Sequence, residues 1–421
     1  MKTKLQYAVL IILIGFTVQA QPAWRQLPSI PLSLARYDDV FFLNPELGWA
    51  ADGYGSSVYK TTDGGLNWDY QFLSPEGEYF RNIEFLNEYV GFLGTLSTNF
   101  YKTIDGGATW ELLPTISENI EAICGLDAVG DHTIYGCGAY FGPAYVIKSV
   151  DDGETWQYID MSAHATTLVE VLFVDENTGY ASGGNANGGV ILKTTDGGAT
   201  WTSLYNTGIP GEYVWKMQRL FSNPQVMFGS VESVAPLKGK LIKSVNGGQS
   251  WVSKEIIDTD IQAVGFITEN HGWMGGHITG FMETFDAGTT WINTGFGYHL
   301  NRIQVFDSGL AYCSGSGIYK FSDENLSTTA VTNNKSGNLN VVVAPNPVKN
   351  TLNLTVDFPK ANHLIISVFD TQGKLVKKLL SETINSPGKR NYSFPFPYKT
   401  GTYYLSLHHD IGAQSVKIIK K

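Results

Sequence analysis

Short runs in which apolar and polar residues alternate fill most of the chain between residues 22 and 326, and polar turns separate them. This alternation is typical of half-buried β-strands. Seven segments share one layout, in which two such runs flank a short polar turn; they are residues 40–53, 83–95, 122–138, 171–184, 219–230, 264–276 and 303–315. The pattern therefore predicts a repeat protein made of seven β units.

Six of these units continue into an eight-residue pattern, Ser/Thr-x-Asp/Asn-x-Gly-x-x-Trp. Its acidic or amide positions are Asp63, Asp105, Asp151, Asp196, Asn246 and Asp286, and its last positions are Trp68, Trp110, Trp156, Trp201, Trp251 and Trp291. An Asp or Asn side chain accepts backbone N–H groups in a tight turn, and Gly adopts the left-handed conformation that other residues resist. The Trp then begins the next strand as a large apolar side chain. We expect all twelve residues to have structural roles in hairpin turns.

The two ends of the repeat region complement each other. Residues 24–27, Trp-Arg-Gln-Leu, resemble the strand after each turn but have no turn before them, whereas residues 318–323 resemble the strand before a turn but no Trp strand follows. Such an offset predicts a closed ring in which the N-terminal strand completes the last unit, and closure removes exposed sheet edges. The expected fold is a seven-bladed β-propeller with four-stranded blades, and an open solenoid is the alternative.

The repeated pattern resembles the Asp-box, or bacterial neuraminidase repeat, of sialidases, sortilin-type receptors and photosystem II assembly-factor-like proteins. The resemblance implies an all-β propeller. It also implies that the boxes stabilise the fold and lie away from any active site.

Three further segments flank the propeller, which we place at residues 21–326. Residues 1–20 combine a basic start, an apolar stretch from Tyr7 to Val18 and small residues before Gln21, which is typical of a cleavable signal peptide. Residues 327–340 lack alternation and aromatic residues, so we expect a linker. Residues 341–421 again alternate, with Pro, Asn or Gly at the turns, and predict a small C-terminal β-sandwich.

The last segment resembles the C-terminal sorting domain of type IX secretion cargo of Bacteroidota. The resemblance rests on Pro345-Asn346-Pro347 before a strand, the hairpin turn at residues 370–374, and Gly401-Thr402-Tyr403-Tyr404 before the final strand. It implies that the type IX secretion machinery is a partner. It also implies a secreted or surface-attached protein.

Charge separates the two domains. Residues 21–340 contain 16 Lys and Arg against 35 Asp and Glu, whereas residues 341–421 contain 11 against 4. An acidic propeller is a poor nucleic-acid binder, so no nucleic-acid partner is expected. No apolar segment of the mature chain is long enough for a transmembrane helix.

Motifs for metal, cofactor or nucleophilic catalysis are missing from the sequence, so we expect no cofactor and no metal. The three cysteines lack metal-ligand spacing. Cys124 and Cys137 fall on adjacent expected strands and either form a disulfide or remain two buried thiols, which leaves Cys313 unpaired.

A glycoside hydrolase is the enzyme alternative, because sialidases and xyloglucan-cleaving enzymes contain similar repeats. Glycosidases need two carboxylates facing each other across a sugar. Candidates near the starts of inner strands are Asp38, Asp39, Glu121 and Glu170, mixed with Arg36, Arg81, Arg219 and Arg302. The Arg-Ile-Pro motif of sialidases is missing, and the xyloglucan enzymes use two propellers where this chain has one. We therefore interpret the mixed charges as a mutually neutralised tunnel mouth.

Strand parity indicates where a ligand would bind. The boxes join the third and fourth strands of each blade, so the opposite face consists of the loops between blades and between second and third strands. Aromatic and basic residues assigned to that face are Tyr140, Phe141, Tyr213, Trp215, Arg81 and Arg302. Aromatic rings stack on sugars or anchor proteins, and arginines pair with acidic groups. The preferred hypothesis is a non-catalytic binding or scaffold protein with an extracellular protein or glycan ligand; a secreted glycoside hydrolase is the alternative.

Overall fold

The structure is a computed structural model that describes residues 22–31, 33, 35–117, 120–138, 142–322, 339–359, 362–369, 375–409 and 412–421. Every regular element in these ranges is a β-strand, and none of the described residues forms an apolar helix of the length that a bilayer span requires. Several predicted segments lie outside the described ranges. They are the expected signal peptide, the end of the last blade (residues 323–326), most of the linker (residues 327–338) and the turn at residues 370–374.

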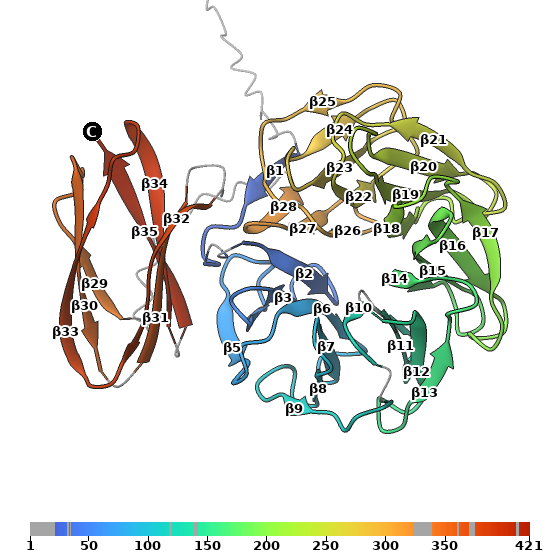
Figure 1. Cartoon of the computed structure of the whole chain (residues 1–421), viewed down its shortest axis with the longest axis horizontal. Helices are drawn as coiled ribbons and strands as arrows, with labels where there is room; N and C mark the ends of the chain where they lie inside the picture. Colours follow the sequence, from blue (N-terminus) through green and yellow to red (C-terminus); the bar gives the residue numbers. More distant parts are fainter. Residues whose placement is uncertain are drawn as a thin grey trace, which may run out of the picture.

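Seven four-stranded sheets within residues 22–322 surround a central axis as the blades of a propeller (Figure 1). Blades 1 and 2 contain β2 (Tyr37–Phe42), β3 (Gly48–Asp52), β4 (Ser57–Thr61), β5 (Asp69–Leu73), and β6 (Phe80–Phe85), β7 (Gly91–Thr95), β8 (Phe100–Thr103), β9 (Glu111–Leu112). Blades 3 and 4 contain β10 (Ile123–Val129), β11 (Thr133–Gly138), β12 (Tyr145–Ser149), β13 (Gln157–Asp160), and β14 (Thr167–Phe173), β15 (Gly179–Asn185), β16 (Gly188–Thr194), β17 (Thr202–Asn206). Blades 5 and 6 contain β18 (Tyr213–Arg219), β19 (Met227–Glu232), β20 (Lys240–Ser244), β21 (Val252–Glu255), and β22 (Ile261–Phe266), β23 (Gly272–Gly276), β24 (Met282–Thr284), β25 (Ile292–Asn293).

Blade 7 closes the ring. It contains β26 (Ile303–Val305), β27 (Ala311–Ser314), β28 (Ile318–Ser322) and, as its fourth strand, β1 (Ala23–Gln26) from the other end of the propeller. The antiparallel register places Trp24 opposite Phe321. The Trp24 ring also stacks on Phe281 of blade 6 at a centroid distance of 4.2 Å. The expected closure by the N-terminal strand is confirmed, and the seven-bladed fold with it.

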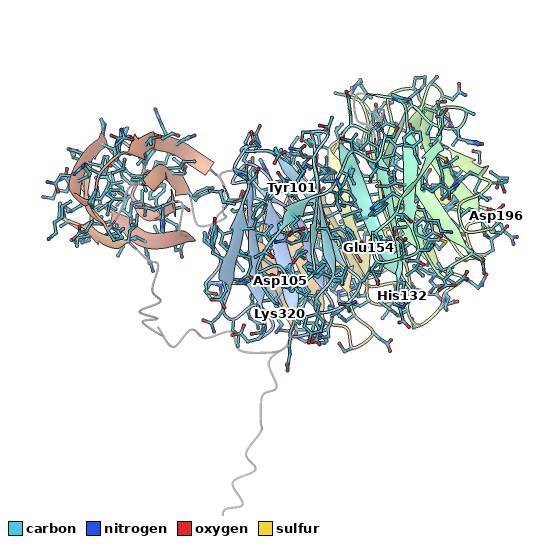
Figure 2. All side chains as sticks on the ribbon, turned by 90° about the horizontal axis from the view of Figure 1, so that it is seen from below. Tyr101, Asp105, His132, Glu154, Asp196 and Lys320 are labelled. Carbon is cyan, nitrogen blue, oxygen red and sulfur yellow. The ribbon has the colours of Figure 1, made fainter. Side chains whose placement is uncertain are left out.

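The hairpin order gives the propeller two different faces. The first-to-second and third-to-fourth strand turns lie on one face, which we call the turn face, and the remaining connections form the loop face. In the side view of Figure 2, Asp105 and His132, from turns of these two kinds, lie nearer the lower edge of the propeller than Tyr101 of β8. The boxes are therefore confined to the turn face.

Hydrogen bonds within each box tie the turn together. In the fourth copy, the Thr194 hydroxyl donates to Asp196 Oδ1 over 2.8 Å, and the Thr200 backbone N–H donates to the same oxygen over 2.9 Å. The Thr200 hydroxyl donates to Asp196 Oδ2 over 2.6 Å, and the Gly198 N–H donates to the Thr194 hydroxyl. These hydrogen bonds favour the charged carboxylate, led by the one from the Thr200 side chain, and lower the pKa of Asp196 to about 2.

Each box also contacts the preceding blade. Where the second strand of that blade offers Trp49, Tyr135, Tyr180 or Tyr312, its N–H or O–H donates to the carbonyl of the first box glycine. The equivalent residues Phe92 and Phe228 have no donor, and the boxes they face contain Asp152 and Ala287 at that glycine position, both with positive φ. A Cβ at Gly64 would lie 3.0 Å from the Pro45 carbonyl oxygen and 3.2 Å from the Tyr312 hydroxyl, and the residue has a positive φ, so glycine is favoured at this position.

We expect Asp196→Ala to lower the melting temperature without affecting ligand binding, because the turn loses all three hydrogen bonds to the carboxylate. Since the folded pKa lies below the ordinary value of 3.8, the contribution is present above that value and is lost as the pH falls towards about 2. Thermal melts at neutral and acidic pH measure both effects. Asp131→Ala, in an exposed turn of the same face, is the control. An unchanged melt combined with lost ligand binding would contradict the structural role.

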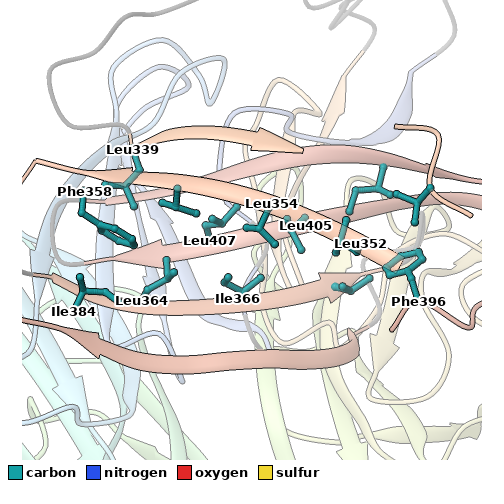
Figure 3. Packing of buried hydrophobic residues seen from close by; sticks show 14 residues of the cluster. Leu339, Leu352, Leu354, Phe358, Leu364, Ile366, Ile384, Phe396, Leu405 and Leu407 are labelled. Atoms are coloured by element: carbon teal, nitrogen blue, oxygen red, sulfur yellow. The ribbon is translucent and has the colours of Figure 1, made fainter. Parts of the chain in front are cut away.

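The C-terminal segment forms two packed sheets, which confirms the expected sandwich. One contains β29 (Asn340–Val343), β30 (Thr351–Phe358) and β33 (Gly388–Pro395), and the other contains β31 (Asn362–Phe369), β32 (Leu375–Ile384), β34 (Gly401–His409) and β35 (Gly412–Lys420). Alternate residues such as Leu352, Leu354, Ile366 and Leu407 are buried between the sheets (Figure 3). This segment therefore has a hydrophobic core of its own.

Candidate functional site

The inner strands share a β-bulge near the loop face. In six blades the register of the first strand shifts by one residue at the same place, and the bulged residues are Asp38, Arg81, Cys124, Val169, Trp215 and Gln262. A bulge inserts one extra residue and redirects its side chain. Four of these residues, Asp38, Arg81, Trp215 and Gln262, line one cavity. The bulge recurs from blade to blade, but the residue at the bulge differs, so four different side chains meet in one site.

That cavity, the loop-face mouth, has a volume of about 470 Å³. Its walls come from strand starts and from loops of blades 1, 2, 5 and 6; they are Arg36, Asp38, Tyr54, Tyr79, Arg81, Leu96, Trp215, Glu232, Asp260, Gln262 and His277. The size lies within the range of sites for small molecules.

Asp38 is the centre of the hydrogen bonds in the mouth. Its carboxylate accepts from Arg36 Nε, from Arg81 Nη1 over 2.9 Å and from the Tyr79 hydroxyl over 3.0 Å. Burial by itself raises the pKa of Asp38, but the two guanidinium groups and the Tyr79 hydroxyl outweigh it and lower the pKa. Asp38 is therefore ionised and neutralised by its partners, which makes it a poor general acid.

The same network continues across the mouth to blade 5. Arg36 Nη1 donates to Gln262 Oε1 over 2.7 Å, and Gln262 Nε2 donates to Glu232 Oε2 over 2.9 Å. The Trp215 indole N–H donates to the same Glu232 oxygen. Arg36 Nη1 also lies 3.0 Å from His277 Nε2; burial first and Arg36 second lower the pKa of His277 to about 4, so the imidazole is neutral and accepts this hydrogen bond.

Aromatic rings cover the rim and one wall. The Tyr54 side chain is 66% exposed and meets Tyr79 edge to face at 5.1 Å. Trp215, 5% exposed, lies against the Arg81 guanidinium at 5.4 Å and stacks on Tyr213 at 6.2 Å. Tyr54 therefore offers the accessible stacking surface in the mouth, whereas Trp215 supports the wall.

A second cavity, the turn-face chamber, opens at the other end of the tunnel and has a volume of about 450 Å³. Its lining comes from the middle and later residues of the inner strands, from the turns after them and from Arg302 directly before β26; it includes Asp127, Glu170, Lys216, Gln218, Arg219, Phe221, Arg302 and Gln304. Inner strands start at the loop face, so their last residues approach the turn face.

Polar side chains along the tunnel also join neighbouring blades. Asp39 Oδ2 accepts from the Ile83 N–H over 3.1 Å, and Asp127 Oδ2 accepts from the Phe173 N–H. The Gln218 amide exchanges two hydrogen bonds with the Phe266 backbone, and Gln304 does the same with Phe42. These contacts bridge blades 1 to 2, 3 to 4, 5 to 6 and 7 to 1. They give the tunnel carboxylates a structural role.

The four sequence-predicted carboxylates have different surroundings. Asp38 and Asp39 contact different partners, Glu170 forms a buried ion pair with Lys216, and Glu121 is exposed and does not line either cavity. Glu232, in contrast, was missed by the sequence analysis although it lines the mouth. Burial raises its pKa. Strand pairing would have revealed Glu232, because the end of the second strand of a blade lies beside the start of the first, inner strand of the same blade.

The predicted binding residues fall into three groups. Arg81 and Trp215 line the mouth, with Tyr213 behind Trp215. Arg302 lies in the turn-face chamber, 3.5 Å from Asp39 and 4.0 Å from Glu84, so its assignment to the loop face was wrong. Tyr140 and Phe141 lie outside the described residues. The role of the described residues in binding stays a prediction.

Two assignments around blade 5 are also corrected. Tyr213 and Trp215 belong to strand β18 and not to a loop, and Arg219 is the last residue of that strand and not near its start. The bulge at Trp215 is the reason, because it interrupts the alternation from which the strand was to be recognised. All three cysteines are buried free thiols, so no disulfide joins Cys124 and Cys137.

Comparisons with known proteins identify the C-terminal part and the fold. Residues 342–421 match the family model described as a secretion system C-terminal sorting domain, which covers less than half of the chain. A domain of this type marks the chain as exported cargo of a secretion system, and thus as a secreted or surface protein. No curated protein matches the sequence.

Solved structures resemble the propeller at low sequence identity. YCF48 from Cyanidioschyzon merolae has a TM-score of 0.57 and 18% identity, covering 72% of this chain and 100% of that chain. YCF48 bound to D1 peptide has a TM-score of 0.54 and 18% identity, over 71% and 96%. PorZ, a surface component of the type IX secretion system of Porphyromonas gingivalis, has a TM-score of 0.51 and 12% identity, over 91% of this chain and 59% of PorZ. These likenesses establish a shared propeller fold.

Proposed function

We propose that the mature chain is a non-catalytic extracellular binding protein whose propeller holds a glycan at the loop-face mouth. The observation that carries the proposal is the combination of an exposed ring, Tyr54, with a polar floor in which Asp38, Arg36, Arg81 and Gln262 are already held by hydrogen bonds. A sugar presents an apolar face for stacking and hydroxyl groups for such a floor. A rigid floor also lowers the ordering cost of binding.

The charge state of Asp38 supports binding without turnover. A glycosidase needs one carboxyl group that gives up a proton and a second carboxylate across the sugar. Asp38 is ionised between two arginines, which supports binding and not proton donation. A peptide is the second ligand class to be tested, because a propeller of this fold has been solved with a peptide.

Binding should depend on Tyr54. Tyr54→Ala should weaken binding of a glycan selected from an array by about two- to tenfold, because one stacking contact is worth roughly 0.5–1.5 kcal/mol. Its stability should not change, since the ring is largely exposed. Tyr89→Ala is the matched control, because Tyr89 is 58% exposed and precedes β7 on the turn face. Titration calorimetry with the mature full-length chain measures both variants.

The same preparations should hydrolyse none of the glycans, including sialosides and xyloglucan. Hydrolysis that disappears in Glu232→Gln, or in a variant of Asp38, Asp39, Glu121 or Glu170, would establish the glycoside hydrolase alternative. Unchanged affinity of Tyr54→Ala would move the ligand away from the loop-face mouth. Selection of peptides in place of glycans would retain the site and change the ligand class.

We further propose that residues 341–421 direct passage through the outer membrane by the type IX machinery. Their separate hydrophobic core and their excess of basic residues support an autonomous signal. In a host with this machinery, a chain ending at residue 340 should remain in the periplasm as a folded propeller, whereas the full chain with Tyr54→Ala should be exported normally. Cell fractionation measures both. Normal appearance of the shortened chain outside the cell would contradict the proposal.

A further inference from the structure

Blade 5 breaks a rule that other blades follow at the end of the inner strand. In blades 1, 2, 4 and 6 the last residue of this strand is a phenylalanine that lies opposite a glycine; the pairs are Phe42 with Gly48, Phe85 with Gly91, Phe173 with Gly179 and Phe266 with Gly272. A Cβ at any of these glycines would lie 2.3–2.5 Å from the ring, so the ring covers the glycine. In blade 5 the pair is Arg219 with Met227, whereas blades 3 and 7 have Ala128 and Val305 at this place. Among the seven described inner strands, that of blade 5 alone has a charged residue there.

Those phenylalanines close the space between blades. Each ring stacks on an aromatic side chain in the second strand of the preceding blade, at centroid distances between 3.5 and 3.8 Å. For blade 5 the corresponding aromatic residue is Tyr180, which lies opposite Leu172 as Tyr312 lies opposite Gln304. Arg219 brings no ring to Tyr180, and it lines the turn-face chamber. The chamber therefore lies beside the place where the repeat loses a phenyl ring and gains a guanidinium group.

Arg219 is a half-buried cation without a close partner. Its guanidinium group forms no hydrogen bond and no ion pair within the part of the chain that the structure describes. Asp175, in the exposed turn after β14, has a lowered pKa, to which the backbone N–H groups of Thr178 and Asn177 contribute most and Arg219 least. The charge of Arg219 is therefore available to a ligand.

Positive charge exceeds negative charge in the chamber. The lining includes three cations, Lys216, Arg219 and Arg302, and two carboxyl groups, Asp127 and Glu170. Lys216 forms a buried ion pair with Glu170, and Arg302 lies 3.5 Å from Asp39 of blade 1. Burial raises the pKa of Asp127 to about 7, so a fraction of this carboxyl group is uncharged at neutral pH. Arg219 is left as the cation of the lining without a counter-charge.

We propose that the turn-face chamber binds a carboxylate that is carried on a short aliphatic chain. The carboxylate would pair with the Arg219 guanidinium group. The chain would lie against the apolar part of the lining, which includes Leu172, Met217, Phe221 and Pro224. Phe221 is 59% exposed, so its ring lies at the opening. This site is separate from the loop-face mouth and does not rest on the glycan proposal.

A single available guanidinium group favours a carboxylate over a phosphate. Its N–H groups lie in one plane and match the two oxygens of a carboxylate. A phosphate carries more charge and takes more donors, whereas Lys216 and Arg302 already face Glu170 and Asp39. Apolar walls stabilise a bound hydrocarbon chain and add nothing for an inorganic anion. The chamber should therefore prefer hexanoate to phosphate.

The test is titration calorimetry of the full mature chain with hexanoate, hexanamide and inorganic phosphate. Hexanoate should bind, and the amide and phosphate should bind at least about tenfold more weakly, because the amide lacks the charge and phosphate lacks the chain. Nα-acetyl-leucine, measured in the same way, distinguishes two sources of the carboxylate. Tighter binding of hexanoate assigns the site to free aliphatic acids, and tighter binding of Nα-acetyl-leucine assigns it to the C-terminal residue of a peptide.

Arg219→Met should weaken hexanoate binding by about tenfold or more, because it removes the cation and keeps an unbranched side chain. Arg219→Lys keeps the charge and loses the planar group, so its affinity should lie between those of the parent and Arg219→Met. Lys238→Met is the matched control, because it removes an exposed cation from the loop after β19. Thermal melts establish that each variant is folded.

Three results would overturn the proposal: no hexanoate binding by the parent chain, equal affinity for hexanamide or phosphate, or parent-like affinity in folded Arg219→Met. The Lys238→Met control and Tyr54→Ala should both bind hexanoate as the parent does. None of these outcomes would affect the glycan site, which Tyr54→Ala tests independently.

Discussion

Deleting residues 22–27 should destabilise the whole propeller and not only its last blade. β1 supplies the fourth strand of blade 7, and its loss leaves the β28 edge unpaired. Trp24 packs on Phe281 and Trp273 of blade 6, so the deletion also removes a contact between blades. We expect Trp24→Ala alone to lower the free energy of unfolding by roughly 3 kcal/mol, as for other large-to-small changes of packed aromatic residues. The deletion should cost more.

Calorimetric or circular dichroism melts of the mature chain measure this effect. Ile292→Ala is the matched control, because Ile292 follows Trp291 as Arg25 follows Trp24, and its side chain is exposed on the fourth strand of blade 6. It should melt within a degree or so of the parent, since exposed substitutions rarely change stability by more than about 0.5 kcal/mol. A deletion variant that melts with the parent would show that the ring does not depend on this closure.

Asp38→Ala should cause the second large loss, about 3–5 kcal/mol of unfolding free energy, because it leaves two buried cations without their carboxylate. Arg36 and Arg81 both pair with Asp38, and the Arg81 side chain is almost fully buried. The substitution would also remove the carboxylate that accepts a hydrogen bond from the Tyr79 hydroxyl. Denaturant unfolding of the mature chain measures the change, with Asp131→Ala in an exposed turn as the control.

A double-mutant cycle separates the ion pair from simple loss of packing. Replacing Arg81 by Met in the Asp38→Ala background should recover part of the lost stability, because one uncompensated charge is then gone. Additive losses from the two changes would show that the pair contributes nothing beyond its separate side chains. A loss no larger than that of the Asp131 control would remove Asp38 from the centre of the mouth.

The fold was accessible from the sequence because its signals are local. Asp196, Thr194 and Gly198 lie within one turn and hydrogen-bond to each other, so the pattern alone carries the hairpin. The sequence also indicated ring closure. The strand of Trp24 has no blade before it, and residues 318–323 have no fourth strand after them, so the two ends of the repeat region complete one four-stranded blade. The sorting domain was recognised from its own motifs, and the family model over residues 342–421 agrees.

The candidate sites needed the tertiary structure. Glu232 reaches the mouth from the end of β19 and meets Trp215 and Gln262, and Arg302, directly before β26 of blade 7, lies 3.5 Å from Asp39 of blade 1. Apart from the contact between Glu232 and Trp215 within blade 5, these contacts join residues of different blades, for which the spacing along the chain carries no signal. The bulges at Asp38, Arg81, Trp215 and Gln262 decide which side chains enter the mouth, and a bulge interrupts the alternation on which strand assignment depends.

The sequence by itself determined most of the strands, the boxes, the number of blades and the export domain, since hydrogen bonds within single turns and the alternation of single strands specify them. Only the tertiary structure decided that Asp38 is neutralised by two arginines and that Arg302 belongs to the turn-face chamber. The physical reason is that charge pairing and burial depend on distances between blades, and the ring closure sets those distances.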